Sequence, residues 1–245
     1  ADGLPLVAIH AANNETGVLQ PVEEISRIVK AAGGVLVLDA VQAAGRIPLD
    51  ISAGYADYLI LSSHKIGGPK GAGAIVAAAD LMMPKLLVVG GGQEKGHRAG
   101  TENLPAIAGF GAAAKEALAA LDAIGVVRAR RDAIEAMVSE LVPDAVFFGA
   151  DVPRLPNTSF FAIPGMKAET AQIAFDLAGV ALSAGSACSS GKVGPSHVLK
   201  AMGVGAGQGA LRVSIGQVTT DEDIGLFRTA LAGIAARRAG GKQAA

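Results

Sequence analysis

The first third of the chain carries short apolar runs that glycine, proline and polar residues separate. Four of these runs predict β-strands, at residues 6–9, 35–39, 58–61 and 74–77. Continuous apolar runs of this length are typical of strands that are buried on both faces of a sheet. Between the first two runs, Pro21 and the acidic Glu23 and Glu24 predict the start of a helix, and Gly33 with Gly34 predicts its end.

Longer periodic segments follow. Apolar residues at every third or fourth position predict helices over about 103–121 and 126–141. After Pro143 the elements shorten: strands at 146–148 and 159–163, helices near 168–178 and 195–202, and a strand at 211–215. Thr220 followed by three acidic residues predicts the start of a last helix, and the tail after residue 239 is expected to fray. This order predicts an α/β fold, with a large α/β domain at 1–122 and a smaller α+β domain at 123–245.

Composition narrows the function. With 51% hydrophobic residues, the chain has enough apolar surface for a sizeable core. Lys and Arg number 21 against 22 Asp and Glu, so net charge draws the chain to neither nucleic acid nor an anionic membrane. No apolar run approaches the roughly 18 residues of a membrane span. A single cysteine rules out an internal disulfide and is typical of the cytoplasm, and four histidines without ligand spacing predict no metal site.

Asp39 and Lys65 suggest the first candidate chemistry. Asp39 ends one predicted strand, and Lys65 follows another within Ser-Ser-His-Lys-Ile-Gly-Gly. Ligands of α/β proteins bind at this end of the strands. Pyridoxal phosphate requires a lysine for its Schiff base and a carboxylate for its ring nitrogen, so the pair is suited to this cofactor. The alternative interpretation, from these two residues alone, is a turn aspartate and a surface lysine.

Two glycine-rich segments supply the other candidates. In the segment 90–103, Arg98 and Thr101 are suited to a phosphate or a carboxylate, although a mobile surface loop fits equally well. The segment 183–195 surrounds Cys188 with Ser, Ala and Gly and has no apolar periodicity. A lone cysteine is commonly a buried apolar residue, but these neighbours favour an exposed, nucleophilic thiol.

Taken together and in order, these segments resemble the cysteine desulfurases of the class V aminotransferase family. The resemblance runs from about residue 7 to 235 and rests on residues 13–17, 39–42, 62–65, 68–71, 90–94, Arg98, 100–101, 156–160, 183–189 and 211–214. It implies a pyridoxal-phosphate-dependent transferase of fold type I. The long loop around Cys188 is similar to the branch that serves nitrogenase or housekeeping iron–sulfur cluster assembly.

The resemblance also implies how the cofactor is held. Lys65 would form the Schiff base with pyridoxal phosphate and move the substrate's Cα proton. Asp39 would pair with the pyridinium nitrogen, and Asn14 and Gln42 would hydrogen-bond near the ring hydroxyl. The implied phosphate contacts are Ser62, His64 and, from the partner subunit of a homodimer, Thr101. His64 is also a catalytic candidate.

For the substrate, the resemblance assigns the L-cysteine carboxylate to Arg212, with Asn157 as a helper. Cys188 would attack the substrate sulfur, leaving L-alanine and an enzyme persulfide, which an iron–sulfur scaffold or sulfur-carrier protein then receives. A selenocysteine lyase, an aminotransferase of the same fold, or a non-catalytic fragment that dimerises or binds a sulfur carrier are the alternatives.

One departure from the family is visible in the sequence. Cysteine desulfurases carry, before the segment 13–17, a Gly/Ala-Thr turn for the cofactor phosphate and a histidine that stacks on the pyridine ring. Neither is present in this chain. We therefore expect a large domain that is truncated at its N-terminus, an open sheet edge, and weak cofactor binding by the chain alone.

Overall fold

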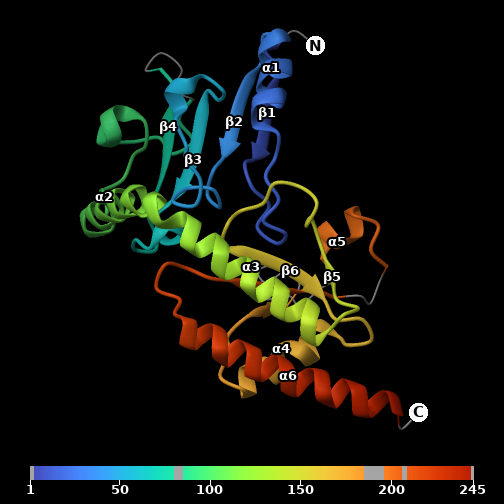
Figure 1. The fold of residues 1–245 in the computed structure, drawn as a ribbon. Helices are drawn as coiled ribbons and strands as arrows, with labels where there is room; N and C mark the ends of the chain where they lie inside the picture. The colour runs from blue at the N-terminus through green and yellow to red at the C-terminus, as the bar shows by residue number, and fades with distance from the viewer. Residues whose placement is uncertain (1–2, 80–84, 185–195, 206–208, 244–245) are drawn as a thin grey trace. The chain divides into compact units, whose positions relative to one another are not determined.

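The computed structural model describes residues 3–79, 85–184, 196–205 and 209–243, and Figure 1 shows their course. The chain divides into two compact units. Unit 1 comprises residues 1–13 and 19–122, and unit 2 comprises residues 14–18 and 123–245. The short segment 14–18 therefore packs with the second half of the chain, which nothing in its sequence had indicated.

Unit 1 is built on a four-stranded sheet of order β1-β2-β3-β4. Its strands are β1 (Leu6–His10), β2 (Val35–Asp39), β3 (Tyr58–Ser62) and β4 (Gly73–Ala77). The first three run parallel, and β4 runs antiparallel to β3. All four lie where the apolar runs predicted strands, and Figure 1 shows them side by side.

Burial of these strands differs from the expectation. Leu36 and Leu38 of β2 are buried, whereas Leu6 at one edge is 68% exposed and Ile75 at the other is 56% exposed. The strands are therefore not buried on both faces within the described residues. Leu38 and Leu59 pack into a small apolar core with the alanines that follow β2, so the centre of the sheet is covered better than its edges.

The first helix of unit 1 begins and ends at its predicted signals, and the second lies within the predicted range 103–121. Helix α1 (Val22–Ala31) follows Pro21 and ends before Gly33, which has φ +67°. Helix α2 (Leu104–Ala119) begins at Asn103, whose side chain accepts a hydrogen bond from Ala106 N. The connection between β2 and β3 holds only turns and the short 3₁₀ helix η1 (Ile51–Ala53). The remaining 3₁₀ helices are η2 (Ser63–Ile66), η4 (Gln93–Gly96) and η5 (Ala120–Ala123).

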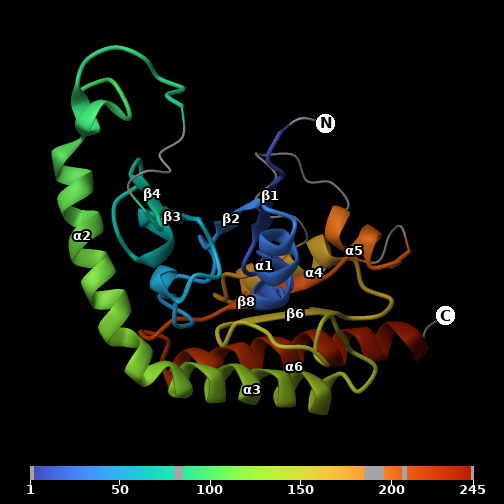
Figure 2. The same ribbon diagram turned by 90° about the horizontal axis from the view of Figure 1, so that it is seen from above.

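Unit 2 has an antiparallel sheet of order β5-β6-β8-β7. Its elements are α3 (Ile124–Leu141), β5 (Val146–Phe147), β6 (Thr158–Ala162), α4 (Ala168–Leu177), β7 (Ser183–Ala184), α5 (His197–Ala201), β8 (Leu211–Ser214) and α6 (Asp221–Gln243). Helices α3 and α6 lie side by side (Figure 2). Phe161, Phe175 and Leu231 are fully buried between the helices and the sheet, in the largest core of the protein.

Helix α6 shows one confirmed and one wrong prediction. Thr220 caps it as expected, because Thr220 N donates to Asp223 Oδ2 at 2.7 Å and Asp223 N donates back to Thr220 Oγ1 at 3.2 Å. The helix then continues to Gln243, so the tail does not fray at residue 239. No helix in the described part of the chain is long and apolar enough to cross a membrane.

Candidate active site

Asp39 and the turn that carries Lys65 lie at the same edge of the unit 1 sheet. Strands β2 and β3 are parallel neighbours, and Asp39, the last residue of β2, pairs with Ile60 of β3. The Asp39 carboxylate is exposed, and one of its oxygens accepts a hydrogen bond from Val41 N at 2.9 Å. This hydrogen bond restrains the orientation of the carboxylate, and the exposed Asp39 side chain is accessible to a ligand.

Lys65 lies in the compact turn that follows β3. Ser62 Oγ and His64 Nδ1 are 2.9 Å apart, and Lys65, in the 3₁₀ helix η2, is half-buried. Gly67 closes the turn with φ +91°. At Gly68 a Cβ would come within 2.3 Å of Ser63 Oγ and 3.2 Å of Ser63 O, so a side chain here would force its neighbours to shift. The turn therefore presents a hydroxyl, an imidazole and an amine within four consecutive residues.

Arg46 connects this turn to the loop after β2, a contact that the sequence analysis missed. Its guanidinium donates from Nη1 to Gln42 O at 2.8 Å and from Nη2 to Lys65 O at 3.2 Å. One side chain thus bonds to the backbone of two predicted cofactor residues. Sequence alone offered no signal for this contact, because Arg46 stands in a turn and outside every quoted motif.

These residues fit pyridoxal phosphate by their chemistry. A carboxylate at the end of one strand suits a protonated ring nitrogen, and a half-buried amine after the next strand suits the aldehyde carbon. The Ser62 hydroxyl and the His64 imidazole are donors of the kind that bind phosphate. Unit 1 therefore supplies a partner for the ring nitrogen, for the aldehyde carbon and for the phosphate of the cofactor.

Thr101 lies apart from this set, in the glycine-rich segment before α2. It is exposed and lines a cavity of about 840 Å³ together with Arg98 and His97. Arg98 is already engaged, since it pairs with Glu94 at 3.1 Å and donates to Gly100 O. Glu94 and Lys95 have φ of 50° and 55°, a conformation that non-glycine residues seldom adopt.

Arg212 belongs to unit 2, on strand β8 between β6 and β7. Its Nη1 donates to Asn14 O at 2.6 Å, and its Nη2 donates to Ser183 Oγ at 3.4 Å. Within the described residues it has no carboxylate partner, and its buried Nε has no acceptor. A half-buried guanidinium without a carboxylate partner in the described part of the chain is suited to an anionic ligand.

Asn14 and Asn157 take part in contacts within unit 2. The Asn14 carbonyl is held by Arg212, as described above. Asn157 is 8% exposed, and its side chain accepts from Thr158 Oγ1 at 3.2 Å and donates to Ile215 O at 3.4 Å. Both ends of the Asn157 amide therefore have a partner inside the protein.

Cys188 lies outside the described residues, but the residue at which the chain resumes is well anchored. Ser196 donates from its hydroxyl to Glu15 Oε2 at 2.5 Å and accepts from Leu199 N at 3.0 Å, at the start of α5. Glu15 is 1% exposed. The sequence motif 13–17 contains Glu15, yet its sequence gave no indication that it bonds to a residue 181 positions away.

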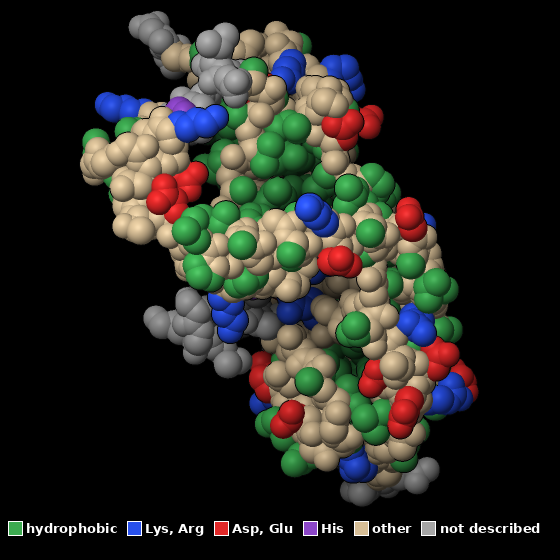
Figure 3. Space-filling view, turned by 90° about the vertical axis from the view of Figure 1, so that its left-hand side faces the viewer, with side chains coloured by type: hydrophobic (Ala, Val, Ile, Leu, Met, Phe, Trp, Pro, Cys, Tyr) green, Lys and Arg blue, Asp and Glu red, His purple; other side chains and the backbone are tan. Residues whose placement is uncertain are grey.

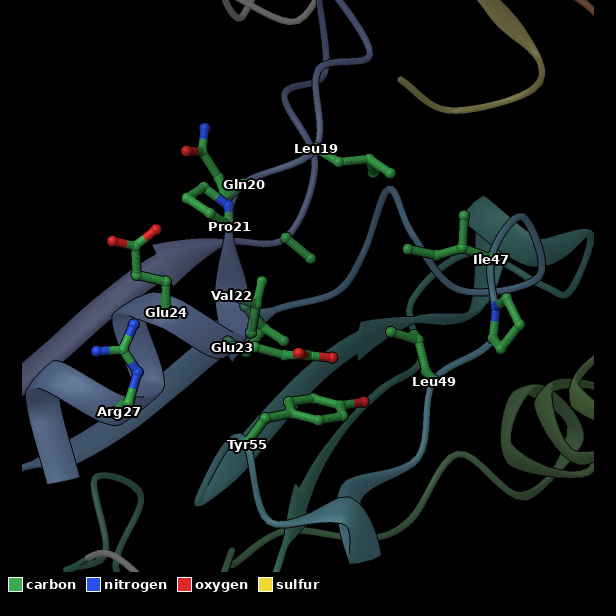
Figure 4. A pocket seen from close by; sticks show the side chains of 13 residues that line it. Leu19, Gln20, Pro21, Val22, Glu23, Glu24, Arg27, Ile47, Leu49 and Tyr55 are labelled. Carbon is green, nitrogen blue, oxygen red and sulfur yellow. The ribbon is translucent and has the colours of Figure 1, made fainter. Parts of the chain in front are cut away.

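Two further cavities lie in unit 1. One, of about 720 Å³, has Glu23, Leu49 and Tyr55 converging on it (Figure 4). The other, of about 660 Å³, lies between α2 and the sheet and has an apolar lining that includes Leu61 and Phe110. Figure 3 shows hydrophobic side chains gathered in a hollow on this side of unit 1. No residue predicted to hold cofactor or substrate lines either cavity.

Comparison with known proteins gives one consistent family. The sequence profile of the family "Aminotransferase class-V" matches residues 1–227. A cysteine desulfurase of Sinorhizobium fredii is 42% identical over 222 residues, which are 89% of this chain and 57% of that protein. The cysteine desulfurase NifS of Azotobacter vinelandii is 40% identical over 226 residues, which are 91% of this chain and 56% of the relative. The chain thus spans little more than half the length of these relatives.

Solved structures agree with the sequence comparison. A NifS-like protein from Rickettsia africae superposes with a TM-score of 0.83 at 37% identity, over 94% of this chain and 62% of that one. Another NifS-like protein gives a TM-score of 0.84 at 34% identity, over 95% of this chain and 61% of the other. The likeness confirms the expected α/β fold of the fold-type I transferases.

Proposed function

This chain belongs to the class V aminotransferase family, and we propose that it carries the catalytic residues of a pyridoxal-phosphate-dependent cysteine desulfurase. The reaction converts L-cysteine to L-alanine and transfers the sulfur to Cys188 as a persulfide. The observation that carries the proposal is that Asp39 ends β2 and Lys65 follows β3, at the carboxyl ends of two neighbouring strands. About 40% identity to named cysteine desulfurases supports the choice of reaction.

Each residue predicted to bind the cofactor has a role in the proposal. Pyridoxal phosphate, once bound, supplies an electron-withdrawing ring that acidifies the Cα–H bond of an amino acid. Asp39 keeps the ring nitrogen protonated, and Ser62 and His64 bind the phosphate. Lys65 forms the covalent link to the cofactor, and its amine, when free, moves the Cα proton of the substrate. Gln42, whose carbonyl accepts from Arg46, hydrogen-bonds near the ring hydroxyl together with Asn14.

Substrate recognition is assigned to Arg212, with Asn157 as its helper. The carboxylate of L-cysteine accepts two hydrogen bonds from the guanidinium, whose charge has no carboxylate partner among the described residues. The thiolate of Cys188 then bonds to the substrate sulfur as the C–S bond breaks. The electron pair of the C–S bond stays with the substrate, Cβ takes up one proton, and Cα regains the proton that was removed from it. L-Cysteine and the enzyme thiol thus yield L-alanine and the enzyme persulfide.

Partners follow from the same proposal. The persulfide sulfur passes to an iron–sulfur scaffold or a sulfur-carrier protein in the cytoplasm. The chain acts as a homodimer in which Thr101 binds the phosphate of the cofactor in the partner subunit. The exposure of Thr101 in a cavity with Arg98 and His97 supports this part of the proposal.

The test traps the cofactor and locates it. The chain is incubated with pyridoxal phosphate, reduced with borohydride and digested, and the modified lysine is identified by mass spectrometry. We expect the adduct on Lys65, with loss of the adduct in Lys65→Ala and its retention in Lys70→Ala, which removes an exposed lysine from the same segment. Modification of Lys65 and Lys70 in equal amounts would sink the assignment of the cofactor.

A second measurement separates the reactions that this fold supports. A cysteine desulfurase releases L-alanine from L-cysteine and accumulates persulfide on Cys188, and Cys188→Ser removes both products. An aminotransferase yields a keto acid from L-cysteine and is indifferent to Cys188→Ser. A selenocysteine lyase turns over L-selenocysteine in preference to L-cysteine, and a non-catalytic fragment yields none of these products.

A further inference from the structure

Resting on the proposed function, we propose that Arg46 is a positioning residue that holds the Lys65 backbone in the orientation its amine needs. No motif of the sequence includes Arg46. Its two hydrogen bonds to Gln42 O and Lys65 O join the loop after β2 to the turn after β3. These two segments, together with the last residues of β2 and β3, carry most of the cofactor residues of unit 1: Asp39, Gln42, Ser62, His64 and Lys65.

The shape of guanidinium explains why arginine suits this place. Its donors diverge from a rigid plane, so that Nη1 and Nη2 reach two carbonyls at once, whereas a lysine ammonium is a single point. Both bonds are charge-assisted, which makes them stronger than bonds between neutral groups. The half-buried position of Arg46 limits competition from water.

The fold also fixes Arg46 itself. Gly45 has φ +69°, and a Cβ there would come within 3.0 Å of Ala117 Cβ in α2. The turn is therefore pressed against α2, and Arg46 N donates to Ala43 O at 3.0 Å. These contacts fix the backbone of Arg46, and its guanidinium, bonded to both carbonyls, restrains the Lys65 carbonyl relative to the loop after β2.

The turn around Lys65 leaves room for such an effect. Its 3₁₀ helix is only four residues long and ends at two glycines, Gly67 and Gly68. Glycine gives the backbone more freedom than any other residue, so a clamp on the Lys65 carbonyl restricts the direction of its side chain. Without the clamp, we expect the amine to sample orientations that do not meet the cofactor.

The experiment measures how selectively pyridoxal phosphate is trapped on Lys65 relative to Lys70. Arg46→Met removes the charge and keeps the apolar stem, Arg46→Lys keeps the charge without the fork, and Arg27→Met is a matched control on the exposed face of α1. Loss of a charge-assisted hydrogen bond corresponds to about a tenfold or larger change in an equilibrium. We expect Arg46→Met to lower the Lys65 to Lys70 ratio about tenfold, Arg46→Lys to restore part of it, and Arg27→Met to leave it unchanged.

Each outcome decides between explanations. If the parent chain traps the cofactor on Lys65 and Arg46→Met keeps the same ratio, Arg46 does not position Lys65 and the proposed function stands. If the parent chain does not trap it on Lys65, the proposed function fails first and this inference with it. Loss of the far-UV circular dichroism signal in both Arg46 variants would show that Arg46 serves the fold, and would overturn the positioning role.

Discussion

Replacing Glu135 by glutamine is expected to destabilise unit 2 through a buried ion pair. Glu135 on α3 accepts two hydrogen bonds from Arg154, at 2.7 and 3.0 Å. The side chains are 17% and 7% exposed. The backbone of Arg154 also forms an isolated β-bridge with Val18, and Leu155 N donates to Gly17 O. The ion pair between Glu135 and Arg154 therefore also supports the segment 14–18.

The magnitude follows from burial. Breaking a buried pair costs about 3–5 kcal/mol because it leaves one charge uncompensated. Glutamine keeps one acceptor and Glu135 retains some contact with water, so we expect a loss of about 2–3 kcal/mol in the free energy of unfolding. The control is Glu140→Gln on the same helix, whose pair with Arg228 has the same two-bond geometry but is 58% and 44% exposed. That change is expected to cost far less, because water screens an ion pair on the surface.

The sign of the pH dependence is also fixed. Burial alone would raise the pKa of the Glu135 carboxyl, but the hydrogen bonds and charge of Arg154 lower it below its ordinary value. A depressed folded-state pKa stabilises the fold above the ordinary pKa of glutamate, about 4.3, and this contribution is lost as the pH falls through the folded value. The difference in the free energy of unfolding between the parent chain and Glu135→Gln therefore becomes smaller as the pH falls.

The assay is urea unfolding followed by far-UV circular dichroism at pH 7 and at pH 4, completed by a double-mutant cycle with Arg154→Met. A coupling energy near 2 kcal/mol is expected at pH 7, within the range of directly contacting residues (about 0.5–3 kcal/mol). Equal losses from Glu135→Gln and Glu140→Gln, or a coupling near zero, would refute the reasoning from burial.

Two other changes test hydrogen bonds that support the two units. Ser196→Ala removes the hydrogen bond to Glu15 and the cap of α5, and is expected to cost about 1–3 kcal/mol in urea unfolding, whereas Ser52→Ala, at an exposed contact with Asp50, changes little. Asp57→Asn weakens the hydrogen bonds that Asp57 accepts from Leu36 N and Lys30 Nζ. Burial would raise the pKa of Asp57, but these hydrogen bonds and the charge of Lys30 lower it below its ordinary value. We expect a loss of about 1–2 kcal/mol at pH 7 that shrinks in acid, and a loss that is constant with pH would contradict the assigned ion pair.

Local patterns predicted the elements of this protein well. The apolar runs located β1 to β4, and Thr220 with Asp223 located the start of α6, because strands and helix caps depend on residues close together in sequence. The order of motifs also predicted the family. Asp39 and Lys65 could be placed at one sheet edge because both follow apolar runs that form parallel neighbours.

Contacts between distant residues were decided only by the tertiary structure. Three hydrogen bonds join residues that are 19 to 198 positions apart in the sequence: Ser196 to Glu15, Arg212 to the Asn14 carbonyl, and Arg46 to the Lys65 carbonyl. The second bond of Arg46, to Gln42 O, is local. The same holds for the exposed edges at Leu6 and Ile75, since burial depends on what covers a strand and not on how apolar it is. A sequence specifies which side chains are available, and packing selects the partner of each, because hydrogen bonds and burial depend on distances that chain order does not contain.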